Sequence, residues 1–146
     1  MLVIYLPDCH ESLAGLVAGR VRENYYRPVF VLTDSEDGVK GSGRSIESYS
    51  MYEELTGCGD LLTKFGGHPM AAGLSLDKEN VEKFKRRLND QCTLSEEELT
   101  EKVVIDMELP FAAITEQFIE ELEYMEPFGK GNTKPVLRQE ASPCSM

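Results

Sequence analysis

The 146-residue chain has the composition of a globular protein, with 41% hydrophobic and 28% charged residues, and its length fits one domain or one domain with a short appendage. It has no apolar stretch of about 18 residues and no basic region before its first apolar run, so we expect a cytoplasmic protein without a membrane span or signal peptide. The net charge of −11 is −3 over residues 1–90 and −8 over residues 91–146, which argues against broad attraction to nucleic acid.

The first third of the chain predicts a strand, a helix and a second strand. Residues 1–7 form an apolar run that ends at a proline, and residues 27–33 form another. Between them, small residues at positions 14, 15, 18 and 19 would let a helix lie close to a sheet. The apolar stripe of this expected helix is formed by Leu13, Leu16, Val17, Val21 and Tyr25. The spacing favours a parallel pair of strands.

The middle of the chain alternates turns with short elements. Residues 34–38 predict a turn, residues 39–47 a glycine-interrupted strand, and residues 50–65 short helices broken at Gly57 and Gly59. We expect a loop around Gly66 and Gly67, and then a strand over residues 70–76. Residues 77–91 predict a helix capped by Asp77, with an apolar stripe at positions 81, 84 and 88.

After residue 91 the sequence becomes acidic. Residues 93–102 predict a connector, 103–109 a strand, 115–125 a helix capped by Thr115, and 126–135 turns, while 136–146 predict no element. The expected fold class is α/β, with a mixed sheet flanked by helices over residues 1–91. A helical linker segment over residues 92–138 and an unstructured tail over residues 139–146 follow.

Two glycine-containing segments carry the strongest functional hints. In GSGRS (41–45), Arg44 with its flanking serines offers donors to a phosphate, and the alternative, which the spacing alone favours, is a bulged strand with an exposed arginine. In FGGH (65–68), bare amides beside His68 suit an anion, although a structural turn would use the same residues. His10 follows a predicted strand, where it would either meet a ligand or cap a helix.

The spacing of the cysteines and histidines does not predict a metal site or a redox site. The four cysteines, Cys9, Cys58, Cys92 and Cys144, form no Cys-x-x-Cys pair, so we expect free thiols. The only two histidines share no metal-binding spacing, and we assign no metal ligand in this chain. A basic cluster at positions 83–87 predicts a solvated helix face, or a rim contact to a nucleic-acid strand.

Three segments occur together in one order: CHESLAGLVAGR (9–20), GSGRSI (41–46) and KFGGHPMAAGL (64–74). Together they resemble the DHH-associated domain of the RecJ family, single-stranded-DNA-specific 5′→3′ exonucleases of the DHH phosphoesterase superfamily. The later segment LEYMEPFGKGNTKPVL (122–137) resembles the RecJ segment that leads toward an OB-fold domain. The resemblance covers residues 3–137.

The resemblance implies the substrate-binding half of an exonuclease that acts in DNA repair and recombination. The implied partners are single-stranded DNA and the DHH catalytic domain of the same enzyme, which would use Mn²⁺ or Mg²⁺. No Asp-His-His triplet occurs in this chain, so we expect it to be inactive alone. The implied phosphate-binding residues are His10, Ser42, Arg44, Ser45, Gly66, Gly67 and His68, with His68 also acting in catalysis.

Two other functions remain open at this stage. In one, the chain is the accessory domain of a DHH phosphoesterase that acts on short oligonucleotides or small nucleotides, although the segment PFGKGN (127–132) argues against this. Alternatively, it is a non-catalytic interaction module whose acidic C-terminal third binds a partner protein.

Overall fold

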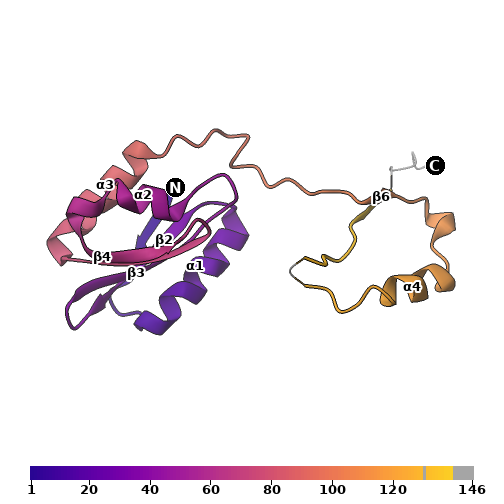
Figure 1. Cartoon of the computed structure of the whole chain (residues 1–146), viewed down its shortest axis with the longest axis horizontal. Helices are drawn as coiled ribbons and strands as arrows, with labels where there is room; N and C mark the ends of the chain where they lie inside the picture. The colour runs from indigo at the N-terminus through magenta and orange to yellow at the C-terminus, as the bar shows by residue number, and fades with distance from the viewer. Residues whose placement is uncertain (130, 140–146) are drawn as a thin grey trace, which may run out of the picture. The chain divides into compact units, whose positions relative to one another are not determined.

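The computed structural model describes residues 1–129 and 131–139, and the chain divides into two compact units, one ending at Glu101 and one beginning at Lys102 (Figure 1). The boundary between the units lies ten residues C-terminal to residue 91, where the sequence predicts the end of the first domain. The domain boundaries expected from the sequence remain predictions. The predicted tail lies almost entirely outside the described residues, as does Cys144. Among the described residues, no helix is long and apolar enough to cross a membrane.

The first unit contains one five-stranded sheet with helices on both sides. Its strands are β1 (Leu2–Tyr5), β2 (Val29–Ser35), β3 (Gly38–Arg44), β4 (Leu62–His68) and β5 (Ala71–Leu76). Its helices are α1 (Glu11–Tyr25), α2 (Met51–Thr56) and α3 (Val81–Gln91), with short 3₁₀ turns at Gly59–Leu61 and Lys78–Asn80.

The sheet is mixed, as the sequence predicts for the fold class. The strand order is β1-β2-β3-β5-β4, with β1 parallel to β2 and every other neighbouring pair antiparallel. The parallel pair is connected through α1, which confirms the predicted strand–helix–strand unit. The other strands are joined by short hairpins and by the α2 segment.

Strand β2 is buried on both faces and separates two apolar clusters. Val29 and Val31 point toward α1, where they pack against Ala14 and Ala18. The alternate residues of β2 point the other way, into a larger cluster formed with α2 and α3. Figure 1 shows α1 on one side of the sheet and the other two helices opposite it.

The larger cluster supplies most of the apolar burial of the first unit. Phe30 of β2 and Phe84 of α3 meet edge to face with ring centroids 5.8 Å apart, and both side chains are fully buried. Val81 and Leu88 lie on the same face of α3 and are also buried, which confirms the predicted stripe. Asp77 makes no capping hydrogen bond, because a 3₁₀ turn separates it from α3, and Asn80 precedes the helix instead.

Helix α1 packs mainly through its small residues, and the predicted apolar stripe is only partly buried, since Val17 and Val21 pack against the cluster that these small residues form with β2. Ala14 and Ala18 are 2% and 0% exposed, whereas Leu13 and Leu16 are 48% and 68% exposed. Alanines allow the helix backbone to approach the sheet closely, which the leucines would prevent. The predicted close approach is therefore confirmed, and Leu13, Leu16 and Tyr25 are the residues of the stripe that lie outward.

Segment 62–68 is a strand, so the predicted helices end earlier and the predicted Gly66–Gly67 loop is wrong. β4 pairs with β5 along its length, and the chain reverses at Pro69 and Met70. The register shifts between Leu62 and Lys64, which indicates a bulge at Thr63. Because of this extra residue, both Leu62 and Phe65 contact the larger cluster.

The second unit contains little regular structure. It has a two-stranded parallel pair, β6 (Met107–Glu108) with β7 (Leu137–Arg138), a 3₁₀ turn at Phe111–Ala113, and α4 (Glu116–Glu123). Thr115 caps α4 as predicted, its hydroxyl accepting from the Phe118 N–H at 3.1 Å. The strand predicted over residues 103–109 is only two residues long, and β7 arises where no element was expected.

We predict that Ala18 of α1 tolerates enlargement far less than the exposed Leu16 tolerates truncation. Ala18→Leu should lower the free energy of unfolding by about 1–3 kcal/mol, because the helix must move off the sheet. Leu16→Ala should change it by less than about 0.5 kcal/mol. Urea denaturation followed by circular dichroism measures both variants. A larger loss for Leu16→Ala would mean that the predicted stripe is the buried one after all.

Candidate functional site

Within the first unit, no helix packs on β5 and β4 on the side of the sheet where α1 lies. We call this side of β3, β5 and β4 the open sheet face, and its β3 margin lies beside α1. α1 packs against β2 and β3, so β5 and β4 continue beyond the helix. Alternation along the strands assigns nine residues to this face: Lys40, Ser42 and Arg44 of β3, Ala71, Gly73 and Ser75 of β5, and Lys64, Gly66 and His68 of β4.

The strand register arranges these nine residues in three rows across the sheet. Arg44, Ala71 and His68 form the first row. The second row consists of Ser42, Gly73 and Gly66, and the third of Lys40, Ser75 and Lys64. Since neighbouring strands lie about 4.8 Å apart, the outer backbones of a row are about 10 Å apart. Cationic groups therefore flank a middle row that is almost without side chains.

The packing of the protein itself does not require glycine in the middle row. A Cβ built on Gly66 would meet no atom within 4 Å, and one on Gly73 would meet only the Gly41 carbonyl oxygen at 3.8 Å. Two hollows of about 330 and 360 Å³ lie on β5, and both are lined by Gly73. The two bare positions therefore leave space that a ligand could enter.

The glycines of β3 serve the packing of the core. Gly41 and Gly43 point into the larger apolar cluster, where an added Cβ would lie 2.5 Å from Leu32 and 2.4 Å from Phe30. They make room for those core side chains, and they do not bring a ligand close to the backbone. The predicted phosphate contact at GSGRS is therefore restricted to the residues on the opposite face.

Arg44 lies half-buried beneath α1 at one end of the open sheet face. Its Nη1 donates to the Gly43 carbonyl at 2.8 Å, and its Nη2 lies 3.0 Å from the position that a Cβ on Gly15 would occupy. Glycine at position 15 of α1 therefore leaves room for the guanidinium. Within the described part of the chain no carboxylate pairs with Arg44, so its charge is available to an anion.

His68 ends β4 in the same row as Arg44, and its side chain is exposed. The imidazole Nδ1 accepts from the Met70 N–H at 3.3 Å, a contact that positions the ring within the hairpin turn. Gly67 points to the other face and has a φ of 151°, and a Cβ there would lie 2.4 Å from the Ala71 carbonyl oxygen. Gly66 and His68 thus belong to the open sheet face, while Gly67 is required by the hairpin.

Three of the residues predicted to bind phosphate do not lie on this face: Gly67, Ser45 and His10. Ser45 is 1% exposed and its hydroxyl donates to the Tyr49 carbonyl, so it stabilises the turn that follows β3. His10 caps α1, with its Nδ1 accepting from the Ser12 N–H at 3.3 Å, which is the alternative considered from the sequence. His10 adjoins Glu11 in the sequence, and Glu11 pairs with Lys40. Lys40 and Arg44 are four residues apart on β3, or about 13 Å, so His10 lies toward the opposite end of the strand from Arg44.

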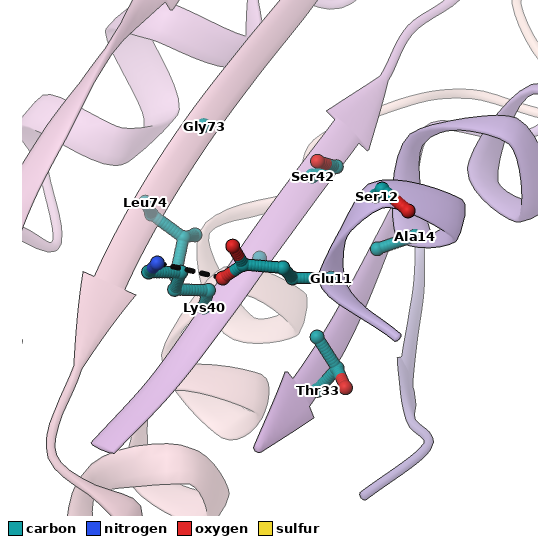
Figure 2. A pocket seen from close by; sticks show the side chains of 9 residues that line it. Glu11, Ser12, Ala14, Thr33, Lys40, Ser42, Gly73 and Leu74 are labelled. Atoms are coloured by element: carbon teal, nitrogen blue, oxygen red, sulfur yellow. Dashed lines mark hydrogen bonds and ion pairs between the residues drawn. The ribbon is translucent and has the colours of Figure 1, made fainter. Parts of the chain in front are cut away.

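The Lys40 end of the open sheet face carries an ion pair. Figure 2 shows the ion pair between the Lys40 ammonium and the Glu11 carboxylate, which both line the 330 Å³ hollow. The nitrogen and oxygen atoms are 2.6 Å apart. This hydrogen bond lowers the pKa of Glu11 and raises the pKa of Lys40. Lys64 is exposed at the other side of the same row, and no described residue forms an ion pair with it.

Lys40, Lys64 and Gly73 were not among the residues singled out from the sequence. The signal that would have found them is the period of two: positions 40, 42 and 44 share a face, as do 64, 66 and 68. For positions 64, 66 and 68, this period places the residues on one face only if residues 62–68 form a strand, which the sequence did not predict.

The described residues do not fit a divalent metal. No group of three or more histidine, cysteine or acidic side chains among them is arranged to hold an ion. Cys9, Cys58 and Cys92 are free thiols, as predicted. Burial raises the pKa of the Cys58 thiol to about 11, so it is protonated at neutral pH.

Family models match most of the chain. The model of the DHHA1 domain matches residues 1–94, and the model of the RecJ OB domain matches residues 105–144. Among curated proteins, the single-stranded-DNA-specific exonuclease RecJ of Bacillus subtilis is 38% identical over 138 residues. That match covers 92% of this chain but 18% of the relative, so the chain spans less than a fifth of that protein's length.

Solved structures show the same relation. The crystal structure of RecJ in complex with Mn²⁺ from Thermus thermophilus superposes with a TM-score of 0.79 at 31% identity, covering 94% of this chain and 20% of that one. The corresponding structure with Mg²⁺ gives a TM-score of 0.77 at 32% identity, covering 92% and 21%. The five-stranded mixed sheet flanked by helices is thus the fold found in this region of those proteins.

We predict that the two adjacent glycines of β4 respond oppositely to a methyl group. Gly67→Ala should lower the free energy of unfolding by about 1–3 kcal/mol, because it strains the backbone and collides with β5. Gly66→Ala should stay within about 0.5 kcal/mol of the parent, because the added methyl enters open space. Urea denaturation of the two variants tests this. Equal losses would show that position 66 is also constrained by the hairpin.

Proposed function

Because the chain belongs to the DHHA1 domain family, we propose that it is the substrate-holding part of a RecJ-type single-stranded-DNA-specific exonuclease. In this proposal the open sheet face binds the sugar–phosphate backbone of a DNA strand. The DHH catalytic domain of the same enzyme would complete the site, and the cleavage would proceed in the 5′→3′ direction in DNA repair and recombination. The curated RecJ relatives, which are named single-stranded-DNA-specific exonucleases, support this proposal.

The observation that carries the proposal is the bare middle row between charged neighbours. Gly66 and Gly73 are exposed and face free space, while Arg44 and His68 stand at one end of the same face. A phosphate can therefore approach the strand backbones closely and still reach an arginine fork and an imidazole. Ser42, in the middle row, adds a hydroxyl donor. The acidic net charge is no obstacle, because the contacts are local.

The composition of the open sheet face also favours a particular mode of recognition. None of its nine residues is aromatic, apart from the imidazole of His68. Proteins that grip bases in single strands rely on stacking against aromatic rings. This face instead offers cations, hydroxyls and bare backbone, which suit phosphate and sugar and are independent of base sequence.

In the proposed enzyme, this chain's residues hold the substrate and do not bind the metal. A divalent ion in the catalytic domain would supply the activated water. Arg44 would orient the phosphate and balance the negative charge that develops on it, and His68 would donate to the same group. The chain by itself should have no nuclease activity and weak affinity for DNA.

A second function, binding of small nucleotides, uses the same face. It would require only the first row, with Arg44 and His68 enclosing a single phosphate. Titration with a mononucleotide and with a long single strand separates the two: tighter binding of the mononucleotide would overturn the DNA proposal. An interaction module that binds no phosphate at all is the third possibility, and the same titration detects it.

We predict that Arg44→Ala lowers the affinity for a fluorescent single-stranded oligonucleotide roughly tenfold, because a charge-assisted hydrogen bond is lost. Fluorescence anisotropy at low ionic strength measures this, and the slope of log affinity against log salt should decrease by about 0.7 for one lost phosphate contact. His68→Ala should weaken binding less, because the imidazole is exposed to water.

The matched control is Arg86→Ala, which removes the same charge from α3 on the opposite side of the sheet. It should leave the affinity within about twofold, since only screened long-range attraction is lost. If Arg86→Ala weakens binding as much as Arg44→Ala, the basic cluster of α3 would be the contact surface instead.

A further inference from the structure

We propose that the row formed by Lys40, Ser75 and Lys64 is a second phosphate subsite on the open sheet face. This inference rests on the proposed function, because it extends the same binding surface along β3. It adds residues that the first row does not contain, and it specifies the ligand: a strand long enough to reach both rows, and not a single nucleotide.

The distance between the rows sets the length of that strand. Lys40 and Arg44 are four residues apart on β3, which corresponds to about 13 Å. A stacked strand rises about 3.4 Å per nucleotide, so roughly four stacked nucleotides bridge the rows, and fewer do so when the strand is extended. A mononucleotide cannot reach both rows.

The space between the rows is continuous with the bare glycines. The hollow of about 330 Å³ is lined by Lys40, Ser42 and Gly73, and that of about 360 Å³ by Lys64, Gly66 and Gly73. Gly73 therefore lies under both hollows, in the middle of the face. A backbone laid across it passes the Ser42 hydroxyl on the way to the lysines.

The two lysines differ in how available their charges are. Lys64 lies exposed on the edge strand, and none of the residues described pairs with it. Lys40 is already paired with Glu11 at 2.6 Å, so an incoming phosphate would have to compete with that carboxylate. Lys64 is accordingly the main cation of the second subsite, and Glu11 weakens the contribution of Lys40.

The test measures affinity of the whole chain as a function of strand length, from a thymidine mononucleotide to a hexanucleotide, at low ionic strength. For the parent protein we expect a rise of roughly tenfold between the shortest and longest ligands, since one charge-assisted contact is added. Lys64→Ala should abolish that rise while leaving the mononucleotide affinity within about twofold. Glu11→Gln should strengthen binding of the longer strands only, because Lys40 is released.

Two further variants keep this proposal separate from the one it rests on. Arg44→Ala should weaken binding of every length equally, and Lys83→Ala on α3 should change none. If the rise with length persists in Lys64→Ala, the second subsite is wrong even though phosphate binding stands. If Arg44→Ala leaves mononucleotide binding unchanged, the proposed function itself is wrong, whatever the result for Lys64→Ala. Circular dichroism of each variant checks that the fold is retained.

Discussion

The two-residue period of β3 is the constraint on which the core and the candidate site both depend. One side of the strand consists of Val39, Gly41 and Gly43, which close the apolar cluster over Leu32 and Phe30. The other side presents Lys40, Ser42 and Arg44. A slip of one residue in register would bury three polar side chains and expose the glycines. Core packing therefore holds the polar series in place, because the Phe30 ring fits only against a residue without a Cβ.

The bulge at Thr63 likewise separates core residues from open-face residues in β4, the edge strand of the sheet. Without it, Leu62 and Lys64 would share one face of β4, since they are two residues apart. With the extra residue, Leu62 and Phe65 both reach the core, and Lys64, Gly66 and His68 all face the open side. The small residues of α1 complete the arrangement, because a helix this close to β2 and β3 leaves β5 and β4 uncovered and lets Arg44 lie beneath Gly15.

Sequence patterns were reliable where one local preference had no competitor. The buried face of α3 followed from the spacing of Val81, Phe84 and Leu88, and the cap of α4 followed from Thr115. Sequence patterns failed where the local sequence was compatible with two structures. Leu13 and Leu16 have the spacing of a buried stripe, yet Ala14 and Ala18 pack on the sheet, because the closeness of the backbones decided which face was buried. Segment 65–68 has the composition of a turn, yet pairing with β5 makes it a strand.

By itself, the sequence determined the α/β class, the parallel connection through the first helix, and the family, because these rest on long apolar runs and on several motifs in one order. The resemblance to the family also grouped Arg44 and His68 as phosphate-binding residues. Only the tertiary structure decided which glycines serve the core and which lie open, and that Ser45 and His10 face elsewhere. The physical reason is that a glycine's purpose depends on the atom its missing Cβ would meet. That atom belongs to a strand or helix distant in sequence, which only the folded chain brings near.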